Sequence, residues 1–179
     1  PGSVGGFGDF GLGDTFAARE ITLSAAFTTA DDGQPARLFV TAEMAPGWHV
    51  YSITQPAGAV KPTKVKLDPS KDFVADGEFS PDRAPEVRKT ELFPVPLEEH
   101  YGAVTFSAPI RISPGVDASQ LQISGELDGM VCHDERGCVP LSLVDTKFVA
   151  RLATGETARG LLAKVPGGAS QPPAGEATA

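Results

Sequence analysis

The chain has 179 residues, a formal net charge of −8 and only two cysteines. At about 150 residues per domain this length predicts one compact domain, and 41% hydrophobic residues suffice to bury a core. The acidic balance argues against a nucleic-acid partner, which needs a basic face, and no window approaches the roughly 18 consecutive apolar residues of a membrane span. Two cysteines are too few for a disulfide scaffold, which leaves one disulfide, one redox pair or half a metal site.

The two ends of the chain differ in composition from its middle. Residues 1–15 contain six glycines and little periodicity, so we expect a flexible leader there. Residues 166–179 read PGGASQPPAGEATA, which predicts a linker to a further segment. Between these ends we expect a β-sandwich over residues 16–153 and a short helix over residues 154–165.

Apolar and polar residues alternate with a period of two through most of the middle of the chain. Such alternation predicts strands with one face on a core and the other in water. The alternating segments are 21–27, 38–44, 104–112, 121–127 and 148–152, and further strand-like segments lie at 48–53 and 139–143. Several short strands with turn signals such as Pro46-Gly47 between them predict an all-β protein, an antiparallel β-sandwich.

One long segment, Ser80–Gly102, breaks this rhythm. It contains four prolines and mixed charge, so it does not read as a central strand. A long irregular segment in a compact domain is often a functional loop that covers a site, but an ordinary crossover between sheets fits equally well.

Cys132 and Cys138 bracket a five-residue loop, residues 133–137, between two strand-like segments. In a hairpin they would lie opposite each other, with Cα atoms about 4.5–5.5 Å apart, a separation that a disulfide accepts. Closing so short a ring stabilises a fold by only roughly 2.4 kcal/mol. A disulfide at a polar hairpin tip is also open to attack by another protein's thiolate. Redox exchange and an inert structural clip are therefore both open.

A metal site is a weaker alternative. Cys132, His133 and Cys138 could join with His49 or His100 to supply four ligands. Adjacent residues in a strand point to opposite faces, however, so the first two rarely converge on one ion. We therefore expect no metal and no bound cofactor.

Three segments, taken in their order along the chain, are similar to a known family. They are GWHVYS at 47–52, LEEHYG at 97–102, and the C-x5-C hairpin followed by Val139-Pro140. Together they resemble the N-terminal periplasmic domain of the thiol:disulfide interchange protein DsbD, over roughly residues 15–153. The resemblance implies an immunoglobulin-like sandwich that acts as a protein-disulfide reductase domain of a larger electron-transfer protein.

The resemblance also implies partners and a location. A thioredoxin-like domain, fed by a membrane module, would reduce the cysteine pair, which would in turn reduce periplasmic disulfide isomerases and cytochrome c maturation thioredoxins. The domain would be a periplasmic monomer, tethered to the inner membrane through a segment outside this chain. The alternative from a different class is a non-catalytic sandwich that binds a protein partner and carries a structural disulfide.

Site residues follow from the same resemblance. Cys138 would hold the intermolecular mixed disulfide, and Cys132 would resolve it. A cap loop would shield the pair, and two residues would flank it. The cap residues would be Glu98, Glu99, His100, Tyr101 and Gly102, and the flanking residues His49 and Tyr51.

The cap departs from the family pattern at one position. Where the family has a shielding phenylalanine this chain has His100, so either His100 or the nearby Phe93 would shield the disulfide. Carboxylates at Glu98 and Glu99 would raise the pKa of the cysteine thiols, whereas Arg136 and His133 would lower it.

Overall fold

The structure is a computed structural model, and it describes residues 20–31 and 33–167. The predicted leader, residues 1–15, and residues 168–179 of the predicted linker lie outside the described residues. The described elements are β1 (Ile21–Thr28), β2 (Arg37–Met44), β3 (Trp48–Tyr51), β4 (Lys64–Leu67), β5 (Phe73–Ala75), β6 (Ser80–Pro81), β7 (Glu86–Arg88), β8 (Leu97–Tyr101), β9 (Ala103–Ile112), β10 (Ile123–Asp128), β11 (Met130–His133), β12 (Gly137–Pro140), a 3-10 turn (Leu141–Leu143), β13 (Lys147–Leu152) and α1 (Gly155–Leu162).

These strands form two sheets, and the predicted all-β sandwich is confirmed. The larger sheet has the order β4-β10-β13-β1-β2-β9-β5, with β6 also on β9, and the smaller has the order β12-β11-β3-β8-β7. One pair is not antiparallel: β1 runs parallel to β13, with Ala26 beside Arg151. A parallel pair needs no hairpin, and these two strands lie near opposite ends of the described chain.

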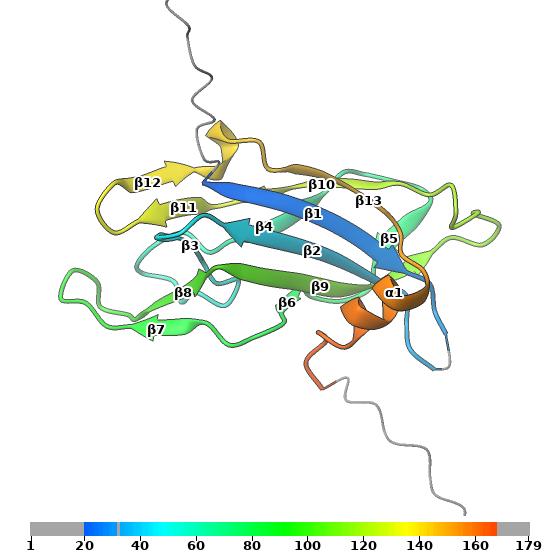
Figure 1. Ribbon diagram of the computed structural model, residues 1–179, viewed down its shortest axis with the longest axis horizontal. Coiled ribbons are helices and arrows are strands. Elements are labelled where there is room, and N and C mark those ends of the chain that lie inside the picture. The colour runs from blue at the N-terminus through cyan, green and yellow to red at the C-terminus, as the bar shows by residue number, and fades with distance from the viewer. Residues whose placement is uncertain (1–19, 32, 168–179) are drawn as a thin grey trace, which may run out of the picture.

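The core joins the two sheets. One buried cluster combines Trp48, Val50 and Val131 of the smaller sheet with Phe106 and Leu127 of the larger one. A second buried cluster lies within the larger sheet and joins side chains of β1, β2, β5 and β9 to those of β10 and β13. The larger sheet therefore curls around its own apolar face. Figure 1 shows the smaller sheet at one end of the molecule, with the β11–β12 hairpin at its tip.

Helix α1 lies on the outside of the larger sheet. Its half-buried residues recur at helical spacing, at Ala158, Leu161 and Leu162. Just beyond it, the Lys164 ammonium donates a hydrogen bond of 3.2 Å to the hydroxyl of Thr105 on β9. Neither α1 nor any other helix within residues 20–31 and 33–167 is long and apolar enough to cross a membrane.

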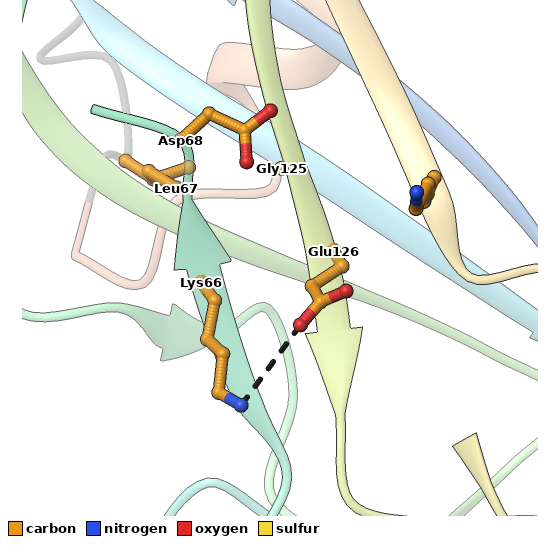
Figure 2. A pocket seen from close by; sticks show the side chains of 6 residues that line it. Lys66, Leu67, Asp68, Gly125 and Glu126 are labelled. Atoms are coloured by element: carbon orange, nitrogen blue, oxygen red, sulfur yellow. Dashed lines mark ion pairs between the residues drawn. The ribbon is translucent and has the colours of Figure 1, made fainter. Parts of the chain in front are cut away.

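A shallow surface pocket lies over the edge of the larger sheet, on β4 and β10 (Figure 2). Its rim is charged: the Lys66 ammonium lies 3.9 Å from Glu126 and 2.8 Å from Asp128. Hydrogen bonds from Lys61 and Lys66 lower the pKa of Asp128 to about 2. These contacts are surface ion pairs, and the pocket belongs to a different sheet from the cysteines.

Gly125, which lines this pocket, has no room for a side chain. A Cβ there would overlap the backbone oxygen of Lys66 and lie 2.8 Å from the ring of Phe148. We expect Gly125→Ala to lower the free energy of unfolding by about 1–3 kcal/mol, because the added methyl group overlaps the backbone of β4. Urea denaturation measures the change. Gly160→Ala, in α1 with nothing within 4 Å, is the matched control. It should stabilise by up to about 1 kcal/mol, and equal effects of the two substitutions would contradict the account.

Candidate redox site

The site is built on the hairpin of β11 and β12. Cys132 and Cys138 are directly opposite each other and form a disulfide, with an S–S distance of 2.06 Å and a Cα–Cα distance of 4.0 Å. The two cysteines differ in their exposure: Cys132 is only 2% exposed, whereas Cys138 lies exposed on the edge strand β12. A sulfur atom of another protein can therefore approach Cys138 and not Cys132.

Strand pairing decides which side chains share a face with the disulfide. In the smaller sheet Cys132 is opposite His49 on β3, and His49 is opposite Tyr101 on β8. Tyr51 and Glu99 form the next pair on the same face, because residues two apart in a strand point the same way. The predicted flanking residues His49 and Tyr51 thus lie beside Cys132, together with two of the predicted cap residues.

Cys132 belongs to a small apolar cluster. Its other buried members are Tyr51 and Leu97, and half-buried Phe93 and Met130 pack against that cluster. Phe93 belongs to the loop between β7 and β8, residues 89–96. Of the two predicted shielding residues, Phe93 is therefore the one that packs on the disulfide's face.

A buried carboxylate lies at the centre of the polar side of the site. Glu99 is 1% exposed, and both of its oxygens accept hydrogen bonds from the Arg88 guanidinium, the Nε bond being 3.1 Å long. The Tyr101 hydroxyl donates to the same carboxylate at 3.2 Å. His49 Nε2 lies 3.5 Å from Glu99 Oε1, and Arg88 lies 4.0 Å from Asp134 in the hairpin loop. One charged network thus runs from β7 across β8 to the hairpin.

Burial and Glu99 set the protonation of the aromatic residues. Burial raises the pKa of Tyr101 to about 12 and, in the same direction, that of Tyr51, with the negative charge of Glu99 adding to both. Burial lowers the pKa of His49, and Glu99 partly opposes that shift. Both tyrosines are therefore neutral near neutral pH, and so is the imidazole of His49.

The hairpin loop is anchored on the other face of the sheet. The ring of His133 packs edge-on against Trp48, with centroids 5.3 Å apart, and its Nδ1 accepts a hydrogen bond from the backbone of Glu135. The turn before β3 leaves room for this ring only because residue 47 is glycine, with φ of +81°. A Cβ at Gly47 would lie 2.5 Å from His133 Nε2.

The cap segment differs from the expectation. The predicted cap loop, residues 98–102, is a strand for most of its length: Leu97–Tyr101 form β8 between β3 and β7, and only Gly102 lies outside it. The prolines that argued against a strand are confined to positions outside 97–101, so the backbone of β8 is free to pair on both sides.

Because neighbouring residues in a strand point to opposite faces, His100 lies on the core face of β8. Its position opposite Val50 directs its ring towards Phe106, with centroids 6.0 Å apart. His100 is 1% exposed, and neither of its ring nitrogens has a hydrogen-bond partner. Glu98 lies on this face too, and its carboxylate accepts a hydrogen bond from Thr54. Neither residue faces the disulfide.

His100 makes folding sensitive to acid. Burial lowers its pKa from 6.5 to about 4 in the folded chain. Between these values the unfolded chain binds a proton that the folded chain does not, so stability falls as the pH drops through this window. Between pH 6.5 and 4 we expect the free energy of unfolding to fall by about 3 kcal/mol less in His100→Leu than in the unaltered chain. Urea denaturation across this pH range measures both proteins, and equal acid losses in the two would contradict the assignment.

Sequence reasoning missed Arg88, which carries the only guanidinium paired with Glu99 among the described residues. It lies in the irregular segment, and only the pairing of β7 with β8 brings it beside the carboxylate. Within residues 20–31 and 33–167 no three His, Cys, Asp or Glu side chains gather into a group that could hold an ion.

Fold and site together define a β-sandwich domain with a cross-strand disulfide at one end, covered on one side and exposed on the other. The family model described as thiol:disulfide interchange protein DsbD, N-terminal, matches residues 17–150. The chain belongs to this family, which confirms the resemblance seen in the sequence. A search of the curated proteins found no match.

One solved structure shows the same kind of fold, and two more are similar at lower TM-scores. The N-terminal periplasmic domain of ScsB from Proteus mirabilis is 13% identical, with a TM-score of 0.50, and the match covers 82% of this chain and 54% of that one. The reduced DsbD N-terminal domain of Neisseria meningitidis is 20% identical, with coverages of 74% and 86% and a TM-score of 0.45. A complex of the DsbD and PilB N-terminal domains from the same organism matches at 17% identity, with coverages of 71% and 80% and a TM-score of 0.43.

Proposed function

We propose that this chain is a periplasmic thiol–disulfide exchange domain that uses Cys132 and Cys138 to pass electrons between proteins. The observation that carries the proposal is the unequal exposure of the two cysteines, one buried and one at the sheet edge. Exchange requires an accessible sulfur that a partner can attack and a protected one that completes the reaction. Membership of the thiol:disulfide interchange family supports the same chemistry.

The reaction is balanced by two thiols of the electron donor. A donor thiolate attacks the sulfur of Cys138, the Cys132–Cys138 bond breaks, and its electron pair and one proton end on Cys132. The donor's second thiolate then attacks the donor's first sulfur in the mixed disulfide. This step forms a disulfide within the donor and leaves Cys138 reduced. The reduced pair repeats these steps in reverse on a protein disulfide, so two electrons and two protons pass through without a bound cofactor.

The proposed donors and acceptors are thioredoxin-fold proteins. A thioredoxin-like domain of an inner-membrane reductase would supply electrons, and periplasmic disulfide isomerases or cytochrome c maturation thioredoxins would receive them. The domain would act as a tethered monomer. An edge strand that carries the reactive cysteine leaves space for such a partner to approach in the plane of the sheet.

Shielding is the second part of the proposal. An accessible disulfide also reacts with unintended thiols, so a domain that docks selected partners needs a cover that the partner displaces. We assign this cover to the β7–β8 loop with Phe93, which packs against the cluster of Tyr51, Leu97 and Cys132. Glu99 and Tyr101 from the predicted cap line the same face, whereas His100 does not.

Single-cysteine variants test the order of attack. Cys132→Ser should accumulate a mixed disulfide with a thioredoxin-fold protein, because Cys138 is exposed and no second thiol resolves the bond. Cys138→Ser should give at least about tenfold less adduct, because Cys132 is buried. Non-reducing electrophoresis and mass spectrometry measure the yield. Absence of any adduct, with a reduction potential below about −300 mV in the unaltered chain, would mark the disulfide as a structural clip.

Removing the cover should raise reactivity without changing the disulfide itself. Phe93→Ala is expected to speed reduction of the disulfide by dithiothreitol several-fold, because the Cys132 side of the disulfide then opens to the thiolate as well as the exposed Cys138. Leu92→Ala, next to it and 84% exposed, is the matched control and should leave the rate unchanged. Rates can be followed by the fluorescence of Trp48, the chain's one tryptophan. Equal rates in the two variants would refute shielding by Phe93.

A further inference from the structure

Exchange at this site requires a proton to reach and leave a buried sulfur. Whenever the bond between Cys132 and Cys138 breaks, Cys132 must gain a proton, and it must lose that proton before it attacks again. Because Cys132 is 2% exposed, bulk water does not serve it directly. A buried thiolate is costly, and the nearby Glu99 carboxylate makes it more so. The proton therefore needs a local acceptor.

The side chains on this face leave one candidate. Glu99 is committed to Arg88 through two hydrogen bonds, and Arg88 has no lone pair to accept a proton. Tyr51 and Tyr101 hold their protons to higher pH than in water. His49 is the remaining group, and it is opposite Cys132 in the sheet. Side chains so paired have Cβ atoms about 4.5–5.5 Å apart, within reach of a thiol and an imidazole.

The side chain of His49 is buried but makes no hydrogen bond to the described part of the folded chain. It is 1% exposed, and neither ring nitrogen has a hydrogen-bond partner. A buried polar group without a partner costs stability and calls for an explanation. Its Nε2 lies 3.5 Å from the Glu99 carboxylate, which favours the tautomer with the proton on Nε2 and leaves the lone pair on Nδ1.

We propose that His49 is the proton acceptor and donor of Cys132, with Glu99 as the positioning carboxylate. The roles match those of a nucleophile, a histidine base and an acid that orients it. As the Cys132 sulfur attacks the mixed disulfide at Cys138, its proton passes to His49, the new S–S bond forms, and the partner's sulfur leaves with the electron pair. In the opposite direction the imidazolium returns the proton to Cys132.

The charged groups around His49 fit this task. Burial lowers its pKa, the carboxylates of Glu99 and Asp134 raise it, and Arg88 and His133 lower it. The balance keeps the imidazole neutral, hence able to accept a proton, at neutral pH. Once protonated, the imidazolium is paired by Glu99.

The test isolates the step in which Cys132 attacks. The proposal rests on the proposed function, but the reagent is a small aromatic disulfide, dithiobis(nitrobenzoate), so no protein partner is needed. The reduced chain releases one nitrothiobenzoate as Cys138 attacks and a second as Cys132 displaces the first adduct. The second phase is first order and independent of reagent concentration. Cys132→Ser, which should release only one equivalent, confirms the assignment of the phases.

His49→Gln should slow the second phase by about 100-fold near pH 7 and leave the first phase unchanged. His100→Gln is the matched control, since His100 is equally buried and equally unpartnered but lies on the opposite face. It should alter neither phase. A second phase of normal rate in His49→Gln, or equal slowing of both phases, overturns the proposal.

The pH profile of the unaltered chain gives a test that does not depend on a variant's folding. With His49 as the base, the second-phase rate should rise with pH and level off below neutrality, as the imidazole loses its proton. A rate that keeps rising tenfold per pH unit up to about pH 9 is that of an unassisted thiol and overturns the proposal. Biphasic release with no transfer to any thioredoxin-fold protein would refute the proposed function alone.

Discussion

The site depends on the register of β3, which pairs with β11 on one side and β8 on the other. On one face this register aligns Cys132, His49 and Tyr101, and on the opposite face it aligns Val131, Val50 and His100. Val131 and Val50 are fully buried in the core shared by both sheets. A slip by one residue would exchange the faces of β3, so the hydrophobic energy that fixes the core also fixes the neighbours of the disulfide.

The buried Glu99 carboxylate is the costly part of this arrangement. Its partner Arg88 is 47% exposed, so the pair is only half withdrawn from water and contributes little to net stability. Its chemical effect is larger, because a negative charge on this face disfavours a thiolate on Cys132. The same charge favours a protonated His49. Glu99 therefore restrains the free thiolate and yet stabilises the charge that forms when the proton moves to the imidazole.

Much of the fold, but less of the site, could be predicted from the sequence. Alternation marks the strands, and the spacing of Cys132 and Cys138 marks their hairpin, because both depend on neighbours along the chain. The family resemblance suggests His100 or Phe93 as the shield of the disulfide, and the sequence alone does not choose between them. The pairing of β8 with β3, which turns His100 to the core, has no local signal in the sequence. Arg88 and Glu99 meet only through the β7–β8 register, for which the sequence carries no local signal.

The geometry separates the route of the electrons from the route of the proton. In the proposed exchange a partner's sulfur reaches Cys138 alone, since β12 is the sheet edge and Cys132 lies one strand further in. Electrons therefore enter and leave through the exposed edge. The proton of Cys132 has no such exit and moves across the strands, towards His49 and Glu99. A partner that covers Cys138 then excludes water from the edge without blocking the group that activates Cys132, so docking and proton transfer do not compete for the same space.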